Sequence, residues 1–535
     1  MKRVVIFGLD GATYTVLDDL VRRSVMPYMG QFMASGARAP LASTVPPLTP
    51  IAWTNLVTGR TPGHHGITGF FQHDGGDSFS VRVATARQLC VETIWSMVSR
   101  QGMRAGCLNF PMHNPAPRIN GYVIPGWVTW RWLKRATHPP ALIDDLKRKI
   151  AGFDLKDLAM RYEEERKAVT GSIMDDYDPW IHLHLRRERQ WFNVLRHQLI
   201  NDPCELTGVV FDGVDKLQHM LWRFLDPALE PAEPSKEWLR IRELSWDYFR
   251  QIDQFLQETV ALAGPEATVL IASDHGFTST DEVLYINSWL EREGYLTWKP
   301  QTPFASEGSL ELGEGVPYHL VAFDLSKTRA FAATASSNGI HIRLPNGSNG
   351  SSGQDYESFR RELGDALLNR CVNPETGQRL VSRVWFREEV FAGPKMSQAP
   401  DITLTLHDNG FFSVFRGDKI LKRRPKTIGT HHPDGIFMIK GPGIRQGERL
   451  GHVQLVDLVP TMLYQLGMPV GLDLEGRVIE EAFTAEHLKV HEVQFGVGAG
   501  EPNFQPDMPD MNGEDTGAED DPQILDRLKA LGYID

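Results

Sequence analysis

An aspartate and a histidine stand together where a strand pattern ends. Residues 268–272 are mostly apolar and partly β-branched, which is typical of a buried parallel strand, and Asp274 and His275 follow shortly after. Chemistry in open α/β sheets collects at the carboxyl ends of such strands. Because a carboxylate and an imidazole are both ligands of zinc-type ions, this strand end is a candidate metal site. On its own, an Asp-His-Gly sequence fits an ordinary strand-end turn better, so the rest of the chain must decide.

The same combination of acids and histidines recurs along the chain. Asp10 directly follows the apolar run of residues 4–9. Asp215 and His219 are four residues apart at a predicted helix start, so they share one face of that helix. His431 comes shortly before another apolar run. The complete set is Asp10, Asp215, His219, Asp274, His275 and His431. Three carboxylates and three imidazoles suit two zinc-type ions about 4 Å apart.

A threonine is the candidate nucleophile. Thr49 precedes Pro50 and a helical pattern, so the sequence predicts Thr49 as the N-cap and Pro50 as the first helical residue. The positive end of the helix dipole would then lie at the Thr49 hydroxyl and favour a phosphate there. A threonine hydroxyl is a weak nucleophile unless such a dipole or a metal ion lowers its pKa. Considered alone, Thr49 fits a purely structural cap equally well.

The order of the predicted elements indicates an α/β fold with a mostly parallel central sheet, flanked by helices and interrupted by two insertions. Prolines break the alternation of strands and helices after residue 110, and residues 301–336 are rich in loops. We expect a catalytic core at 1–110, 204–300 and 426–490, a cap-like insertion at 111–203, a second insertion or subdomain at 301–425, and an acidic flexible tail with a short C-terminal helix at 491–535.

The first insertion contains an aromatic and basic stretch at residues 127–135. Trp130 could stack on the leaving group of a substrate, and Arg131 could contact additional phosphate charge. The alternative, which we favour, is a packed cap whose Arg and Lys side chains extend to solvent. His182 and His184 are two residues apart on a predicted helix, so they do not share a face and are not expected to bind metal.

Composition limits the classes of partner. The 535 residues carry a formal net charge of −12, which argues against a general nucleic-acid binder. The four cysteines form no CxxC pair and are expected to be reduced thiols. No apolar run is long enough to span a membrane, and the first apolar run is too short for a signal peptide. We therefore expect a cytoplasmic protein that acts on a small substrate; the sequence does not indicate its oligomeric state.

Taken in order, these motifs resemble the alkaline phosphatase superfamily, in particular its type I phosphodiesterase/nucleotide pyrophosphatase family. The resemblance rests on Gly8-Leu-Asp10-Gly, Thr49-Pro50, Leu56-Val-Thr-Gly59, His65-Gly-Ile67, Asp215-x-x-x-His219, Ser273-Asp-His-Gly276, Gly429-x-His431 and Asp457-Leu-Val-Pro-Thr461. It implies an alkaline-phosphatase-like core with two divalent ions, zinc in the first place, with manganese and iron as alternatives.

The resemblance also implies a role for each site residue. One ion would be held by Asp10, Asp274, His275 and the Thr49 oxygen, and the other by Asp215, His219 and His431. One ion would activate Thr49, which forms a phosphothreonine intermediate, and the other would polarise the scissile phosphoryl oxygen.

One position departs from the family pattern. Nucleotide pyrophosphatases resembling this chain have a phosphate-contacting asparagine three residues after the His-Gly-Ile, where this chain has Phe70. Asn109, at the end of another predicted strand, is a candidate substitute. We expect a two-metal phosphoesterase, with a diester or pyrophosphate favoured. The alternatives are phosphonate or sulfate ester hydrolysis and a phosphosugar mutase. A non-enzymatic binding scaffold is disfavoured because no expected ligand is missing.

Overall fold

The computed structural model describes residues 2–73, 81–159, 161–173, 175–300, 302, 320, 322–344, 353–498, 500 and 503. These residues form two compact units. Unit 1 consists of the described parts of Met1–Thr61, Thr85–Phe277 and His432–Asp510, and unit 2 of those of Pro62–Ala84 and Thr278–His431. The predicted acidic stretch and C-terminal helix lie almost entirely outside the described residues.

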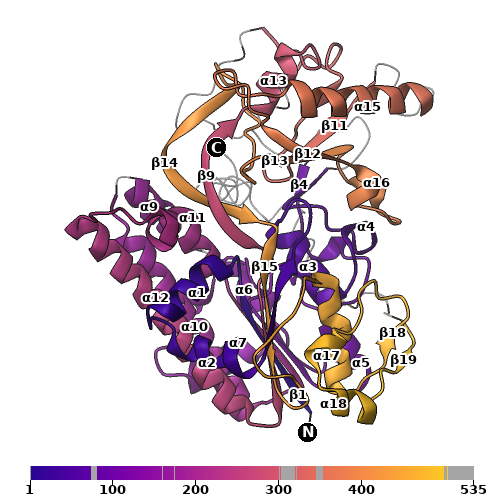
Figure 1. Ribbon diagram of the computed structural model, residues 1–535. Helices are drawn as coiled ribbons and strands as arrows, with labels where there is room; N and C mark the ends of the chain where they lie inside the picture. The colour runs from indigo at the N-terminus through magenta and orange to yellow at the C-terminus, as the bar shows by residue number, and fades with distance from the viewer. Residues whose placement is uncertain are drawn as a thin grey trace. The chain divides into compact units, whose positions relative to one another are not determined.

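A mixed sheet forms the centre of unit 1 (Figure 1). Within the described residues it has nine strands, in the order β16 (Glu448–Arg449), β2 (Ala37–Ala42), β15 (Asp434–Lys440), β8 (Ala267–Ala272), β1 (Arg3–Leu9), β7 (Leu206–Phe211), β5 (Ala105–Leu108) and β6 (Gly121–Ile124), with β17 (Val453–Gln454) also paired to β2. The pairs from β8 to β6 are all parallel, and β15 is antiparallel to both of its neighbours. The predicted mostly parallel α/β sheet is confirmed.

Strand β1 occupies the middle of this sheet because both of its faces are apolar. Its residues from Val4 to Leu9 are all buried. Pairing on both sides aligns Leu9 with Phe211 of β7 and Gly8 with Ala272 of β8. The residues that follow these three strands therefore meet at one edge of the sheet, which is where the sequence places its acids and histidines.

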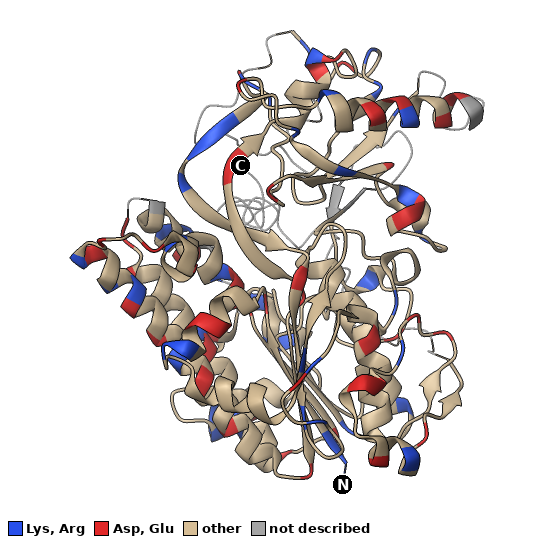
Figure 2. Cartoon of the chain, viewed as in Figure 1, with Lys and Arg blue, Asp and Glu red and all other residues tan. Residues whose placement is uncertain are grey.

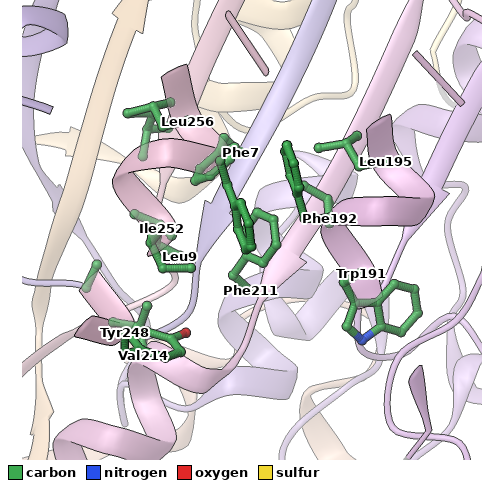
Figure 3. Close-up of a cluster of buried hydrophobic side chains, with 14 of the residues drawn as sticks. Phe7, Leu9, Trp191, Phe192, Leu195, Phe211, Val214, Tyr248, Ile252 and Leu256 are labelled. Carbon is green, nitrogen blue, oxygen red and sulfur yellow. The ribbon is translucent and has the colours of Figure 1, made fainter. Parts of the chain in front are cut away.

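Helices cover both faces of the sheet and bury a separate apolar core on each face (Figure 1). One face packs against α1 (Tyr14–Arg22), α2 (Pro27–Ser35), α10 (Asp178–Asn201), α11 (Gly213–Leu225) and α12 (Lys236–Ala263). The other packs against α3 (Thr49–Thr58), α5 (Ile94–Arg100) and α17 (Leu458–Leu466). On the first face, Phe7 and Phe211 contact each other at 4.8 Å between ring centroids, with Phe192 of α10 beside them (Figure 3).

The α/β pattern continues through part of the stretch predicted as the first insertion. Strand β6 extends the sheet beside β5, and α10 buries Trp191 and Phe192 in the same core as Phe7 (Figure 3). The sequence reading missed β6 because Pro115, Pro117 and Pro125 flank the strand without entering it, which an edge strand tolerates. The remaining helices of this stretch are α6 (Trp130–Ala136), α7 (Leu142–Lys149), α8 (Leu155–Leu158) and α9 (Tyr162–Ile173).

Unit 2 contains a four-stranded sheet in the order β10 (Ala330–Phe331), β11 (Gly339–Ile342), β13 (Ile402–Leu406) and β12 (Val381–Phe386), whose pairs are antiparallel. The helices described in this unit are α4 (Pro62–His65), α13 (Ile286–Arg292), α15 (Gly353–Arg370) and α16 (Arg387–Val390), and β3 (Phe71–His73) pairs antiparallel with β4 (Val81–Val83). The segment Pro62–Ala84 thus belongs to unit 2, although the sequence placed it with the first core segment.

A two-stranded ribbon pairs β9 (Gly276–Leu284) with β14 (Leu421–His432). The first half of β14 carries Lys422, Arg423, Arg424 and Lys426 and appears blue in Figure 2. Three short elements near the end of unit 1 are β18 (Val470–Gly471), α18 (Ala485–Val490) and β19 (Phe495–Gly496). Among the helices that the structure describes, none is long and apolar enough to cross a membrane.

Candidate active site

The backbone turn after β1 contacts the residues that follow β8. The backbone N–H of Gly11 donates a hydrogen bond to Asp274 Oδ1 at 3.1 Å. Gly11 has φ +69°, and a Cβ at this position would lie 2.7 Å from the Phe277 ring. Both the backbone conformation and the close approach therefore require glycine. The Asp-Gly pair of the sequence motif places Asp10 and Asp274 side by side.

His275 is oriented with one ring nitrogen toward the acids. Its Nδ1 lies 3.0 Å from the carbonyl oxygen of Gly276. Because a carbonyl can only accept, Nδ1 must carry the proton of the neutral ring, and Nε2 presents a lone pair. The Nε2 atom lies 3.3 Å from Thr49 Oγ1, 3.4 Å from Asp274 Oδ2, 3.7 Å from Asp10 Oδ1 and 3.9 Å from Asp215 Oδ1. A metal-ligating histidine typically has this arrangement, with its far nitrogen held by an acceptor.

Two carboxylates of this cluster are buried with an oxygen that has no hydrogen-bond partner among the described residues. Asp10 and Asp274 are both buried, and in the described part of the chain Asp10 Oδ1 and Asp274 Oδ2 have no hydrogen-bond partner. Burial raises the pKa of Asp274 to about 8, and the charge of Asp215 adds to this rise. Burial, followed by the charges of Asp274 and Asp215, also raises the pKa of Asp10 well above its ordinary value. Buried carboxylates are stable as anions only when paired or when coordinating a metal.

These atoms fit a divalent ion. Ligand atoms of Asp10, Asp274 and His275 all lie within 4.8 Å of one another. The set contains two partnerless carboxylate oxygens and one imidazole lone pair, which are hard and borderline donors of the kind that zinc, manganese and iron accept.

Asp215 and His219 lie one turn apart on α11, which starts directly after β7. His219 Nε2 is 3.3 Å from Asp215 Oδ1, and both side chains are buried. The His219 ring stands edge-on to Phe277 at 4.8 Å between centroids. The same Phe277 therefore packs against Gly11 and against His219, so that it supports both groups of acids and histidines.

Thr49 is the first residue of α3 and not its N-cap, which corrects the expectation from the sequence. Leu48 is the N-cap residue: its backbone is extended, and its carbonyl accepts hydrogen bonds from the N–H groups of Ile51 and Ala52. Pro50 is consequently the second helical residue. The Thr49 hydroxyl lies 3.3 Å from His275 Nε2, and the side chain is 1% exposed.

The side-chain N–H group of Asn109 is engaged within the protein and is therefore not placed to donate to a ligand. Its Nδ2 donates to the Val210 carbonyl at 2.8 Å and approaches Asp212 Oδ1 at 3.5 Å. The atom without a partner in the described residues is Oδ1, which is an acceptor. A phosphate oxygen needs a donor, so this geometry does not suit the role of the missing family asparagine.

The remaining predicted residues belong to other elements. Trp130 starts α6 and is 43% exposed, with Arg131 at 5.8 Å and Lys156 at 5.1 Å from its ring centroid. His431 is buried near the end of β14, where its ring contacts Phe411 of the same unit at 5.3 Å. Phe70 is buried in unit 2, and its carbonyl accepts from the N–H of Ala84.

A buried polar network at the start of α11 was not recognised from the sequence. Glu188 of α10 accepts from the N–H of Gly213 at 2.6 Å and from the Tyr248 hydroxyl at 3.2 Å, both at Oε1. Nearby, Lys216 Nζ lies 2.9 Å from Asp212 Oδ2. The network joins α10 and α12 to the first turn of α11, the helix that carries the candidate metal ligands. The only sequence signal is a run of charged residues on a helix, which normally indicates an exposed face.

Glu188 should make the stability of the protein depend on pH. Burial, followed by the charge of Asp212, raises the pKa of Glu188 from 4.5 to about 8. The folded protein therefore holds a proton that the unfolded chain releases between these values, so this stabilisation is complete below pH 4.5 and is lost as the pH rises through 8. Gln keeps the Oε1 acceptor and has no charge. We expect the melting temperature of Glu188→Gln to exceed that of the wild type increasingly from pH 5 to pH 9, as measured by circular dichroism. The exposed Glu266→Gln serves as the control; a parallel pH dependence in the wild type and Glu188→Gln would contradict the assignment.

The chain is similar to several solved structures. The human ectonucleotide pyrophosphatase/phosphodiesterase 5 superposes with a TM-score of 0.51 at 14% identity, over 90% of this chain and 100% of that chain. An inactive variant of the murine protein in complex with AMP gives 0.50 at 12% identity with the same coverage. Phosphonoacetate hydrolase from Sinorhizobium meliloti 1021, in complex with phosphonoacetate, gives 0.48 at 16%, over 87% of this chain and 95% of that chain. A search of curated protein sequences found no match.

The family model for type I phosphodiesterase / nucleotide pyrophosphatase matches residues 4–434. This range contains β1 at its start, α3, α11 and β8, and it ends just after β14. The chain therefore belongs to the type I phosphodiesterase/nucleotide pyrophosphatase family and is a metal-dependent hydrolase of the phosphoesterase type.

Proposed function

We propose that this chain hydrolyses a phosphate diester or a pyrophosphate through a covalent phosphothreonine at Thr49. The observation that carries the proposal is the contact between Thr49 Oγ1 and His275 Nε2 at 3.3 Å, beside the acids Asp10, Asp215 and Asp274. A buried hydroxyl next to partnerless carboxylate oxygens and an imidazole lone pair is what a metal-activated nucleophile requires.

Each half of the site would hold one divalent ion. Asp10, Asp274, His275 and the Thr49 oxygen would hold the first, and Asp215, His219 and His431 would hold the second. Zinc fits this mixture of imidazole and carboxylate donors, and manganese and iron share it. When bound, two such ions lower the pKa of the attacking hydroxyl and stabilise negative charge on the phosphoryl oxygens.

Groups of the protein itself orient the reacting atoms. Helix α3 aims the Thr49 oxygen at the phosphorus of the substrate, and His275 is kept in one tautomer by the Gly276 carbonyl. The threonine oxygen bonds to phosphorus as the bond to the leaving group breaks, and the proton of the hydroxyl passes through solvent to the departing group. The phosphothreonine formed from a diester keeps the second ester group. A water molecule then attacks its phosphorus; the threonine oxygen leaves with one proton of the water, which regenerates the hydroxyl and releases a phosphate monoester.

Substrate choice depends on groups outside this centre, because the centre handles only the phosphoryl group. The murine relative is known in complex with AMP, and a nucleotide is a candidate here too. Phe70 stands where the family's phosphate-contacting asparagine is expected, and Asn109 presents an acceptor, so another donor must meet the phosphate. The cytoplasmic location expected from the sequence stays a prediction.

A panel of para-nitrophenyl esters tests the proposed function. With zinc, manganese or iron supplied, we expect turnover of the phosphate diester to exceed that of the phosphate monoester, phenylphosphonate and sulfate ester. No turnover of any phosphorus ester by protein that carries two ions would contradict a phosphoesterase. Faster turnover of the sulfate or the phosphonate would assign the scaffold to that class instead.

The same panel tests whether Trp130 and Arg131 select the substrate. If the exposed ring and its cation meet the leaving group, Trp130→Ala and Arg131→Ala should raise KM for a nucleotide diester about tenfold and change the minimal aryl diester far less. Trp246→Ala is the control, because Trp246, like Trp130, is flanked by two cationic side chains, here Arg242 at 4.6 Å and Arg23 at 5.7 Å. Equal losses on both substrates would mean that α6 only supports the core.

A further inference from the structure

Helix α3 carries a second polar group toward the acid cluster. Trp53 lies one helical turn after Thr49, so the two side chains share a face of α3. Its indole Nε1–H donates a hydrogen bond to Asp10 Oδ2 at 3.2 Å, and the side chain is completely buried. An indole N–H donates only, so this bond needs an acceptor such as a carboxylate.

The backbone of β1 leaves room for this ring. A Cβ at Gly8 would lie 2.7 Å from Trp53 Cη2, closer than carbon atoms normally pack. On another side, Phe110 stands nearly perpendicular to the indole, with 5.4 Å between ring centroids. Gly8 and Phe110 therefore fix the indole plane, and the indole fixes Asp10. The first glycine of the sequence motif Gly8-Leu-Asp10-Gly therefore has a structural role: because it has no side chain, it leaves space for the Trp53 ring.

Because of this hydrogen bond, the two carboxylate oxygens of Asp10 have different roles. Oδ2 is occupied by the indole, whereas Oδ1 is the atom without a partner in the described residues and lies 3.7 Å from His275 Nε2. We propose that Trp53 is a positioning residue that holds Asp10 with Oδ1 toward the first ion and ties this ligand to the helix that carries Thr49. The inference rests on the proposed function, since it assumes that Asp10 binds the ion. Partners of this kind, one step removed from the metal, typically change metal affinity 10–100-fold.

Trp95 provides a matched control within the same core. It is also fully buried, it also stands edge-on to Phe110, with 5.1 Å between ring centroids, and its indole donates one hydrogen bond, to His113 Nε2 at 2.9 Å. Trp53→Phe and Trp95→Phe therefore remove the same atoms and one hydrogen bond each from residues that both contact Phe110. They differ in whether the lost bond reaches a proposed metal ligand.

The test is a zinc titration of metal-free protein against a competing chromophoric chelator. We expect wild type to bind two ions. Trp53→Phe should still bind two, with the Kd of one raised at least about tenfold and the other within about twofold of wild type. Trp95→Phe should change neither Kd, although thermal melting should show a comparable loss of stability. Saturating zinc should restore most of the activity of Trp53→Phe, because the variant lacks no group that touches the substrate.

Asp10→Asn separates failure of this inference from failure of the proposed function. If Asp10→Asn binds both ions like wild type, the proposed metal site is wrong. If Asp10→Asn loses one ion while Trp53→Phe keeps both affinities, or if Trp95→Phe weakens binding equally, only the role of Trp53 is wrong. Should Trp53→Phe not fold, Trp53→Met keeps more of the apolar volume without the donor. Failure of both Trp53 variants to fold beside a folded Trp95→Phe would make Trp53 a core residue and overturn the inference.

Discussion

Thr49→Ala should lower turnover by at least about a thousandfold while leaving the fold intact, because it removes the proposed nucleophile. The side chain is buried, and among the residues that the structure describes its hydroxyl has one polar contact, with His275, so the loss of the hydroxyl should cost little stability. The measurement is kcat on a phosphate diester with two ions supplied. Acid-quenched reactions analysed by mass spectrometry should yield a phosphopeptide containing Thr49 from the wild type and not from the variant.

Thr58→Ala is the matched control for this substitution. Thr58 ends the same helix, is fully buried, and donates its hydroxyl to the Thr54 carbonyl at 2.7 Å. Its loss should leave kcat within about twofold of wild type, since no reacting group is removed. If Thr49→Ala kept a tenth of the wild-type rate with its ions bound, Thr49 would not be the nucleophile.

Removal of metal should abolish activity, and two ions per chain should restore it. Asp274→Asn should weaken the first ion by at least about a hundredfold, because Asn keeps the acceptor for the Gly11 N–H but loses the anionic oxygen. Atomic absorption and zinc titration measure the number and affinity of the ions. The kcat on the diester should fall when the ions are lost and recover when they bind. His219→Ala should weaken the other ion, because His219 and Asp215 of α11 are two of its three proposed ligands.

Asp253→Asn is the control for Asp274→Asn. Asp253 is another buried aspartate, on α12, whose carboxylate accepts from the N–H groups of Tyr28 and Met29 at 3.0 and 2.7 Å. This substitution should lower the melting temperature without changing the metal content. Full activity in excess chelator, or one ion per chain in the active wild type, would contradict the two-ion assignment.

The strand ends at the site could be predicted from the sequence because two local signals coincide there. β1 and β8 are uninterrupted apolar runs, which identify buried parallel strands, and the residues after them are acids and a histidine. Parallel pairing then brings Asp10 and Asp274 to the same edge of the sheet. For α11, the spacing of Asp215 and His219 was sufficient, since a helix places residues four apart on one face.

Features that depend on distant partners could not be predicted. The start of α3 is displaced by one residue because the Leu48 carbonyl already accepts from two helical N–H groups, a detail that the Thr-Pro pair does not reveal. Glu188 is a charged residue within a helix, and the sequence predicts such a residue to be exposed. Only its hydrogen bonds with Gly213 and Tyr248 show that it is buried. The role of Trp53, on helix α3, likewise depends on Gly8 of strand β1, which the sequence shows only as part of a motif.

The central position of β1 has a consequence for synthesis on the ribosome. Val4 pairs with Leu206 on one side and with Thr268 on the other, and Gly11 binds Asp274, 263 residues later in the chain. At about 5–20 residues per second, the time between the synthesis of Gly11 and the synthesis of Asp274 is roughly 10 to 50 s. Until β7 has been translated, β1 is an apolar segment with two unpaired edges on an unfinished polypeptide, and until β8 follows it keeps one unpaired edge; both states are prone to aggregation. The nascent chain must be shielded, by its own early helices or by a chaperone, until the strands on both sides of β1 have been translated.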